Sequence, residues 1–258
     1  MTRRARGRVV LVGAGPGDPE LITVKGLGWL RRADVVVYDR LADRALLDEA
    51  PRGAELIDAG KAPGRHTLDQ EAINAVLIAR ALAGKTVIRL KGGDPGIFAR
   101  AAEELGALRA AGVGVEVVPG VTAATAAAAR AGFSLTDREH VSTVVLTTGS
   151  VAGDREAGPS RWTALAGADG TLVFYMPVRS LVSIVDALLE GGRAPGEPAL
   201  LLQGAWTPRE RQLFAPLERV AARARELELQ APAILIVGAV VAQSPGWVGA
   251  AAGEAVAR

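Results

Sequence analysis

Three glycine-rich turns contain the residues of this chain best suited to bind a small molecule. They span Gly13–Asp18, Gly92–Pro95 and Pro119–Ala123, and each directly follows a β-branched run. Glycine permits positive φ angles and close approach of a ligand to the backbone, and open α/β sheets bind small molecules at the turns after parallel strands. We therefore expect the three turns to form one shared pocket.

The first turn matches a dinucleotide-binding loop only in part. Gly13–Gly15 follows one predicted strand and Asp39 ends the next, as in such loops. However, Asp18 stands where the third glycine belongs, and Pro16 stands where the backbone should enter a helix. No Gly-Lys-Ser/Thr follows, so the turn is not a Walker A loop either. A nicotinamide or nucleoside-triphosphate enzyme is therefore disfavoured.

Short β-branched runs alternate with helix-like segments along the chain, which predicts an α/β fold with largely parallel strand pairing. The expected strands lie near residues 8–12, 34–38, 54–58, 86–90, 114–118, 142–147, 171–175, 198–202 and 233–238.

The clearest helix signal lies between the third and fourth strands. Thr67–Gln70 reads as a capping box, Ile73, Val76 and Leu77 form an apolar stripe, and Gly84 suits the C-terminal turn.

A second helix is expected at residues 98–111, with Glu103, Glu104 and Arg109 facing away from its apolar stripe. It is expected to begin immediately after the second glycine turn, and another helix, around 23–32, after the first. The free N–H groups of both helix starts would then face a polar or anionic ligand.

The alanine-rich tract Ala123–Ala131 follows the third turn, and it is expected to be a short packed helix because alanine is the best helix former. A surface loop is expected at 151–162, which is rich in Gly, Pro and Asp. The predicted division is an N-terminal domain at 1–122, a C-terminal domain at 123–245 and a weakly structured tail at 246–258.

Composition narrows the class of protein. The 258 residues are 49% hydrophobic, enough for a core, and include no cysteine. A disulfide framework, a thiolate metal site and a cysteine nucleophile are thus excluded, as suits a reducing compartment. His66 and His140 show no metal-ligand spacing, so no metal is expected. No apolar run approaches the roughly 20 residues of a membrane span, and the basic start reads as the tail of a cytoplasmic protein.

Charge and aromatic content bear on possible partners. The formal net charge is +2, with 26 arginines and four lysines, and aromatic residues make up 4%. Nucleic-acid binding is disfavoured because no basic stripe carries stacking rings. Arginine forks suit carboxylate or phosphate ligands.

Five motifs in order along the chain resemble those of the tetrapyrrole methylases. They are Val10–Thr23, Val36–Leu41, Arg89–Pro95, Val118–Ala123 and Leu172–Met176. The resemblance implies two α/β domains with the active site in the cleft between them, S-adenosylmethionine as cofactor, and a homodimer. It also implies methylation of uroporphyrinogen III at carbons 2 and 7, which gives precorrin-2 and S-adenosylhomocysteine on the route to sirohaem and cobalamin.

The resemblance also assigns roles to residues. It places Asp39 at the proton acceptor and Lys61 at the proton donor, and Arg40 is expected to pair with substrate carboxylates. The expected cofactor-binding residues are Pro16, Gly92, Gly93, Asp94, Ile97, Thr122, Ala123 and Met176, with Gly204 or Ala205 completing the site.

Plainer roles stay open for three of these residues. Asp39 would otherwise be a strand-end cap, Lys61 a solvated loop lysine, and Met176 a core residue. The rival functions are methylation of a later precorrin, methylation of a macromolecule, and cofactor or tetrapyrrole binding without turnover.

Overall fold

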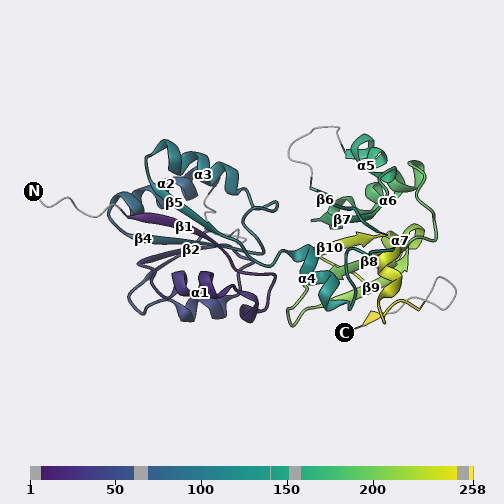
Figure 1. Ribbon diagram of the computed structural model, residues 1–258, viewed down its shortest axis with the longest axis horizontal. Coiled ribbons are helices and arrows are strands. Elements are labelled where there is room, and N and C mark those ends of the chain that lie inside the picture. The colour runs from purple at the N-terminus through teal and green to yellow at the C-terminus, as the bar shows by residue number, and fades with distance from the viewer. Residues whose placement is uncertain (1–6, 61–68, 140, 151–157, 249–255, 258) are drawn as a thin grey trace, which may run out of the picture. The chain divides into compact units, whose positions relative to one another are not determined.

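The computed structural model describes residues 7–60, 69–139, 141–150, 158–248 and 256–257. The chain divides into two compact units, Met1–Ala123 and Ala124–Arg258 (Figure 1). Each unit contains one β-sheet with helices packed against it, so the predicted α/β fold is confirmed.

The sheet of unit 1 has five parallel strands in the order β3-β2-β4-β1-β5. They are β1 (Arg8–Gly13), β2 (Val35–Tyr38), β3 (Glu55–Asp58), β4 (Thr86–Lys91) and β5 (Gly114–Val118). Central strands buried on both faces favour apolar side chains on both faces, as in the fully buried Val9–Val12 run. Parallel pairing brings all the carboxyl ends, and the glycine turns that follow them, to one edge of the sheet.

Helices cover both faces of this sheet (Figure 1). One face packs against α2 (Gln70–Leu82) and α3 (Ala101–Ala110) through a cluster that includes Val9, Val37 and Leu77. The opposite face, with Val10 and Leu90, packs near α1 (Val24–Leu30) and the 3-10 helix η2 (Arg44–Glu49). A further 3-10 turn, η1 (Pro19–Leu21), lies between β1 and α1.

Two helix starts differ from expectation. The N-cap of α2 is Asp69, whose side chain accepts a hydrogen bond from the N–H of Ala72, whereas the capping box placed the start at Thr67, outside the described residues. Gly84 takes the expected C-terminal turn, with φ of 85°. Helix α3 begins only at Ala101, because Arg100 before it has φ of 58°. The predicted start of this helix directly after the second glycine turn is therefore wrong.

Unit 2 contains a six-stranded sheet in the order β11-β9-β8-β10-β7-β6. The strands are β6 (Val144–Thr148), β7 (Thr171–Tyr175), β8 (Pro198–Gln203), β9 (Arg211–Pro216), β10 (Ala233–Val237) and β11 (Val256–Ala257). Only β6 and β7 pair in parallel, while the other neighbours are antiparallel. The expectation of largely parallel pairing thus fails here, because β8 and β9 are joined by a short turn with no crossover helix. Strand β9 was not predicted.

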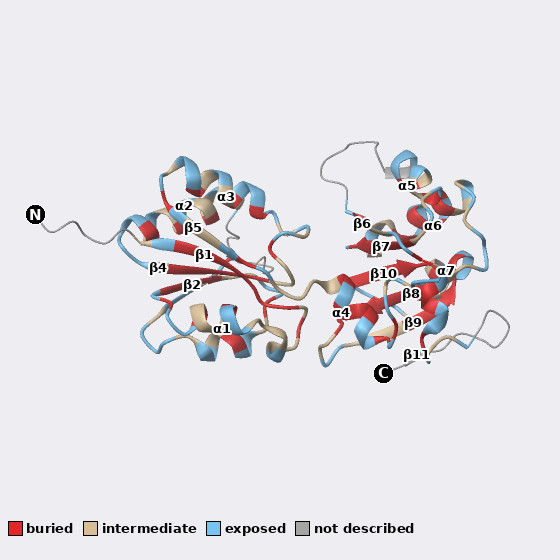
Figure 2. Ribbon diagram, viewed as in Figure 1, coloured by how far each residue is buried: buried red, intermediate tan, exposed pale blue. Residues whose placement is uncertain are grey.

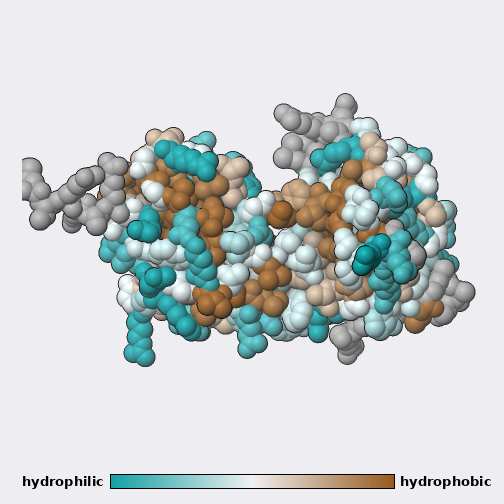
Figure 3. All heavy atoms as spheres, viewed as in Figure 1, coloured by the Kyte–Doolittle hydropathy of each residue, from teal (hydrophilic) through white to brown (hydrophobic). Residues whose placement is uncertain are grey.

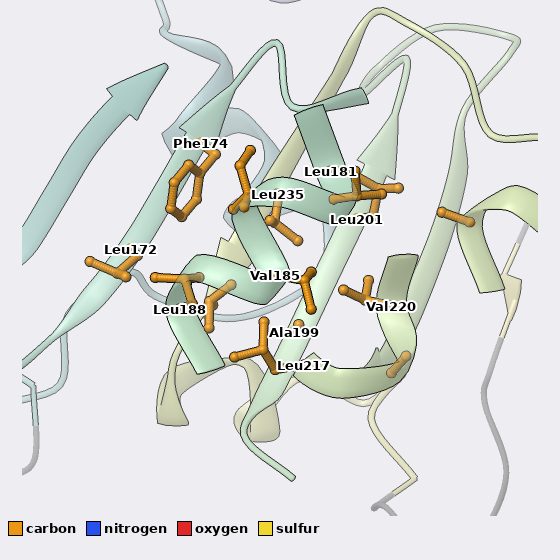
Figure 4. Close-up of a cluster of buried hydrophobic side chains, with 14 of the residues drawn as sticks. Leu172, Phe174, Leu181, Val185, Leu188, Ala199, Leu201, Leu217, Val220 and Leu235 are labelled. Carbon is orange, nitrogen blue, oxygen red and sulfur yellow. The ribbon is translucent and has the colours of Figure 1, made fainter. Parts of the chain in front are cut away.

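Helices α5 (Gly158–Ala166), α6 (Leu181–Glu190) and α7 (Leu217–Glu226) enclose the largest core of unit 2. Figure 4 shows Leu188 and Val185 of α6 with Leu172 and Phe174 of β7 and Val220 of α7 in this cluster. The buried faces appear in red in both units of Figure 2. Helix α5 overlaps the loop expected at 151–162, whose residues 151–157 are outside the described part.

Three further elements complete unit 2. Helix α4 (Ala123–Arg130) starts on the last residue of unit 1 and confirms the helix expected in the alanine-rich tract. The 3-10 helices η3 (Val178–Ser180) and η4 (Ala239–Gln243) follow β7 and β10. The tail expected from 246 contains strand β11, which pairs with β9, and its residues 249–255 and 258 lie outside the described part.

On the face that Figure 3 shows, hydrophilic residues are interspersed with hydrophobic ones on each unit. Among the described residues, no helix is long and apolar enough to cross a membrane.

Candidate active site

The structure brings the three glycine turns of unit 1 together at the carboxyl end of its sheet. Gly15 and Gly93 pair as an isolated bridge, in which the Gly93 N–H donates to the Gly15 carbonyl at 2.7 Å. A Cβ atom on Gly13 would stand 2.6 Å from the Gly120 Cα and 2.7 Å from the Gly93 oxygen. Because these backbones touch, glycine is required at Gly13 and Gly120 to let the turns meet.

Asp94 ties the second turn to the third. One carboxylate oxygen accepts a hydrogen bond from the Gly96 N–H at 2.7 Å, and the other accepts one from the Gly120 N–H at 2.9 Å. The Ile97 N–H donates to the Asp94 carbonyl at 3.2 Å, which closes the turn. Asp94 therefore holds the backbone of the second and third turns together.

Gly93 presents open backbone at the centre of this arrangement. Its φ is 69°, and a Cβ atom placed on it would meet no atom nearer than the Ala123 nitrogen at 4.0 Å. Pro16, Ile97 and Thr122 are half-buried around the same turns. Gly92 differs in having no open space beside it. A Cβ there would stand 2.7 Å from the Leu41 Cβ, so glycine is needed at this position for packing. The opening at Gly93 fits the close approach of an adenosyl group to the backbone.

Asp39 lies at the carboxyl end of β2 and is held by a buried arginine. The Arg89 Nη2 donates to the Asp39 Oδ1 at 2.5 Å, and the Asp39 side chain keeps 29% of its surface exposed. Within the described residues, the other oxygen, Oδ2, accepts no hydrogen bond. Asp39 thus has one oxygen held by Arg89 and one without a hydrogen-bond partner among the described residues.

Arg89 belongs to a buried network on the α2 and α3 side of the sheet. Its Nε donates to the Glu104 Oε1 at 2.9 Å, and its Nη1 donates to the carbonyls of Val37 and Leu90 at 3.3 and 3.4 Å. The Lys91 Nζ donates to the same Glu104 oxygen at 2.9 Å. Glu104 is completely buried, so the prediction that it faces away from the core is wrong.

The network shifts the pKa values of its two cations in opposite directions. Burial lowers the pKa of Arg89, but the charges of Asp39 and Glu104 and their hydrogen bonds outweigh burial and keep that pKa above its ordinary value. The pKa of Lys91 is held below its ordinary value, first by burial and then by the Arg89 charge. Buried groups with shifted pKa values often lie at functional sites.

The other residues predicted near the substrate are less constrained. Arg40, next to Asp39, is exposed, as a residue that pairs with substrate carboxylates has to be. Lys61 lies outside the described residues, as do His66 and His140. The roles of Arg40 and Lys61 stay predictions.

In unit 2, the predicted cofactor residue Met176 follows β7 in a constrained conformation. Its φ is 52° and 48% of its surface is exposed, so it is not a core residue. The preceding Tyr175 is buried, and its hydroxyl accepts a hydrogen bond from the Ala124 N–H at 3.3 Å. This contact fixes the end of β7 against the first turn of α4, which begins at the predicted cofactor residue Ala123.

The other predicted cofactor segment of unit 2, Gly204–Ala205, is also braced against α4. Gly204 has φ of 56°, and the next residue but one, Trp206, has φ of 61°. The Trp206 Nε1 donates to the Ala126 carbonyl at 2.9 Å, and the Arg130 guanidinium lies over the indole ring, 5.3 Å from its centroid. Glu210 accepts from both the Trp206 N–H and the Arg130 Nε at 2.8 Å.

Sequence reasoning missed Arg89, Lys91 and Glu104 as members of the site. A signal was present, because Arg89 and Lys91 alternate with apolar residues in the central strand Thr86–Lys91. Two cations on one face of a buried strand require a buried anion, and only the fold identifies it as Glu104.

Comparison with known proteins gives concordant matches. Residues 8–221 match the Tetrapyrrole (Corrin/Porphyrin) Methylases family. The chain is 43% identical over 235 residues to the S-adenosyl-L-methionine-dependent uroporphyrinogen III methyltransferase of Methanosarcina barkeri, covering 91% of this chain and 92% of that protein. It resembles the crystal structure of the Thermus thermophilus uroporphyrin-III C-methyl transferase complexed with S-adenyl homocysteine, with a TM-score of 0.77, 42% identity, and coverage of 91% and 99% of the two chains.

Longer relatives match over part of their length. The chain is 47% identical over 248 residues to siroheme synthase 2 of Halorhodospira halophila, which covers 95% of this chain and 50% of that protein. The chain thus spans about half the length of the first curated relatives it matches.

Proposed function

We propose, from the premise that this chain belongs to the tetrapyrrole methylase family, that it methylates uroporphyrinogen III at carbons 2 and 7 with S-adenosylmethionine to give precorrin-2. The observation that carries the proposal is the match at nearly full length to the Methanosarcina barkeri uroporphyrinogen III methyltransferase. The joined glycine turns and the half-buried Asp39 supply the groups that this reaction needs.

The methyl donor sets the demands on the protein. S-adenosylmethionine, when bound, supplies a methyl group already activated on a sulfonium. The pyrrole carbon of the substrate forms the new carbon–carbon bond as the methyl–sulfur bond breaks, and the sulfur keeps the electron pair as a neutral thioether. One proton leaves the substrate for each methyl group gained. Alignment and removal of water are therefore the main contributions expected of the protein.

The residues of unit 1 fit these tasks. We assign cofactor binding to Pro16, Gly92, Gly93, Asp94, Ile97, Thr122 and Ala123, with the open backbone at Gly93 as the main support. Asp39 accepts the proton, because its Oδ2 is available while Arg89 holds its Oδ1. We assign Arg40 to a substrate carboxylate because it is exposed next to Asp39, and Lys61 to the proton-donor role that the resemblance implies.

The residues of unit 2 complete the proposed cofactor set. Met176 offers an exposed thioether for apolar contact with adenine, and Gly204 and Ala205 supply backbone in a segment braced by Trp206. We also infer a cytoplasmic homodimer that feeds sirohaem or cobalamin synthesis. Sedimentation at micromolar concentration tests the dimer, and a monomer at that concentration would remove it from the proposal.

An anaerobic incubation of the purified protein with uroporphyrinogen III and S-adenosylmethionine tests the activity. The expected product carries two added methyl groups and gives an isobacteriochlorin-type spectrum after oxidation. No methyl gain with S-adenosylhomocysteine binding intact would reassign the substrate to a later precorrin or a macromolecule. If S-adenosylhomocysteine binds but no tetrapyrrole or macromolecule tested gains a methyl group, the result would favour a binding module without turnover.

A further inference from the structure

Glu104 is the most unusually placed acidic residue among those the structure describes. It lies on α3 with no exposed surface, and its Oε1 accepts hydrogen bonds from both the Arg89 Nε and the Lys91 Nζ, each at 2.9 Å. Gln70 on α2 donates to the same oxygen at 3.4 Å. The second oxygen, Oε2, has no hydrogen-bond partner among the described residues. Burying a carboxylate with half of its acceptors unused is costly, so its presence calls for a cause other than stability.

The guanidinium of Arg89 joins Glu104 to Asp39. Its Nε edge is held by Glu104 and its Nη2 points to the Asp39 Oδ1 at 2.5 Å. Only a planar fork can make these two contacts at once in a fixed geometry. The orientation of Asp39 therefore depends, through Arg89, on the carboxylate of Glu104, which is itself inaccessible to substrate.

The four ionised groups balance in charge, since Asp39 and Glu104 oppose Arg89 and Lys91. Without the charge of Glu104, two buried cations would face one carboxylate, and the Nε edge of Arg89 would be held at most by a neutral acceptor. The guanidinium would then be free to turn toward Asp39 and occupy both of its oxygens. A bidentate pair of that kind would remove the oxygen that is left to accept a proton.

We propose that Glu104 is a positioning residue for methyl transfer, acting through Arg89 to keep Asp39 oriented with its Oδ2 available. This inference rests on the proposed function, because it assumes that Asp39 accepts a proton. It goes beyond that function by assigning a role to a residue that cannot touch substrate.

The test is a double-mutant cycle on methyl transfer between Glu104→Gln and Asp39→Asn. Steady-state transfer of label from S-adenosylmethionine to uroporphyrinogen III gives kcat and KM, and calorimetry gives the affinity for S-adenosylhomocysteine. Glu104→Gln is expected to lower kcat roughly 10- to 100-fold, the scale of a misplaced catalytic group, with KM and S-adenosylhomocysteine affinity unchanged. In the Asp39→Asn background the same change is expected to have no further effect on kcat.

Two further variants guard against a purely structural effect. Glu116→Gln removes another ion-paired glutamate of unit 1, one that pairs with Lys25, and is expected to leave kcat unchanged. Glu104→Asp keeps the charge but shortens the side chain, and is expected to give a kcat between those of the wild type and Glu104→Gln. If Glu104→Gln does not fold, Glu104→Asp takes its place in the cycle.

The outcomes separate the inference from the function beneath it. A loss of kcat for Asp39→Asn with normal kcat for Glu104→Gln would overturn the inference alone. Equal losses from the Glu104 variant in both backgrounds would also overturn it, because Glu104 would then act independently of Asp39. Normal kcat for Asp39→Asn would remove the proton-acceptor role and the inference together.

Discussion

The carboxylate of Asp94 accepts a hydrogen bond from the backbone N–H of Gly120 at 2.9 Å, although 26 positions separate the two residues. Through this bond the turn after β4 holds the turn after β5, and the Gly15–Gly93 bridge adds the turn after β1. The site of unit 1 is thus a set of backbones locked to one another, with one side chain as the connector.

Replacing Asp94 tests this connection. An asparagine has one acceptor oxygen, so Asp94→Asn leaves either the Gly96 or the Gly120 N–H without an acceptor. We therefore expect the free energy of unfolding in urea to fall by about 1.5–3 kcal/mol. S-adenosylhomocysteine affinity should fall as well. Asp69→Asn is the matched control, because asparagine caps a helix as well as aspartate does. Equal stability of Asp94→Asn and the wild type would contradict the brace.

Gly93→Ala and Gly112→Ala form a second matched pair. Both glycines have positive φ, 69° and 65°, and a Cβ atom would meet little or nothing at either. Each substitution should cost a similar 1–2 kcal/mol of stability, roughly the cost of a left-handed alanine. Only Gly93→Ala should weaken S-adenosylhomocysteine binding in calorimetry. The same affinity in both variants would place the cofactor away from Gly93.

Asp39→Asn tests the proposed proton acceptor. We expect kcat to fall by about 10²–10⁴-fold, the usual contribution of a general base, while S-adenosylhomocysteine affinity is unchanged. Asp48→Asn, at an exposed position in η2, is the control and should have wild-type kcat. Turnover near the wild-type rate in Asp39→Asn would leave Asp39 as a strand-end cap.

Trp206→Phe tests the brace on the Gly204–Ala205 segment. The change removes the indole hydrogen bond to the Ala126 carbonyl, so stability should fall by about 0.5–1.5 kcal/mol, and S-adenosylhomocysteine should bind more weakly. Trp29→Phe is the matched control, because it removes another indole whose ring lies beside an arginine, 4.6 Å from the guanidinium of Arg32 in unit 1. It should lower stability without changing affinity, and a matching loss of affinity there would point to a global effect.

Glu116→Gln gives a prediction on pH dependence. The pKa of Glu116 is lowered from 4.5, chiefly by its hydrogen bond with Lys25. A carboxyl group whose pKa is lower in the folded than in the unfolded chain stabilises the fold at pH values above its pKa in the unfolded chain. That contribution is lost as the pH falls through its pKa in the folded chain. The variant should be less stable by about 0.2–1 kcal/mol at neutral pH, and thermal unfolding should show the difference vanish well below pH 4.5.

Most elements were legible in the sequence because each strand is a short apolar run bounded by turn residues. Strand β9 was not predicted because its first residues, Arg211 and Gln212, are polar. The antiparallel pairing of unit 2 was not predicted because the sequence of an apolar strand such as β10 does not indicate the direction of its neighbours. Glu104 was misplaced because helical spacing favours an all-apolar stripe, whereas the buried face of α3 combines it with Ala101 and Leu108.

The sequence by itself determined the family, the alternation of strands and helices, and the glycine turns, since these depend on local spacing and backbone freedom. The tertiary structure alone decided which turns touch, that Asp94 serves as their connector, and that Asp39 is held by Arg89 and Glu104. The reason is physical. Hydrogen bonds and charge pairs among residues 15 to 50 positions apart depend on strand order and on helix rotation, which no local pattern specifies.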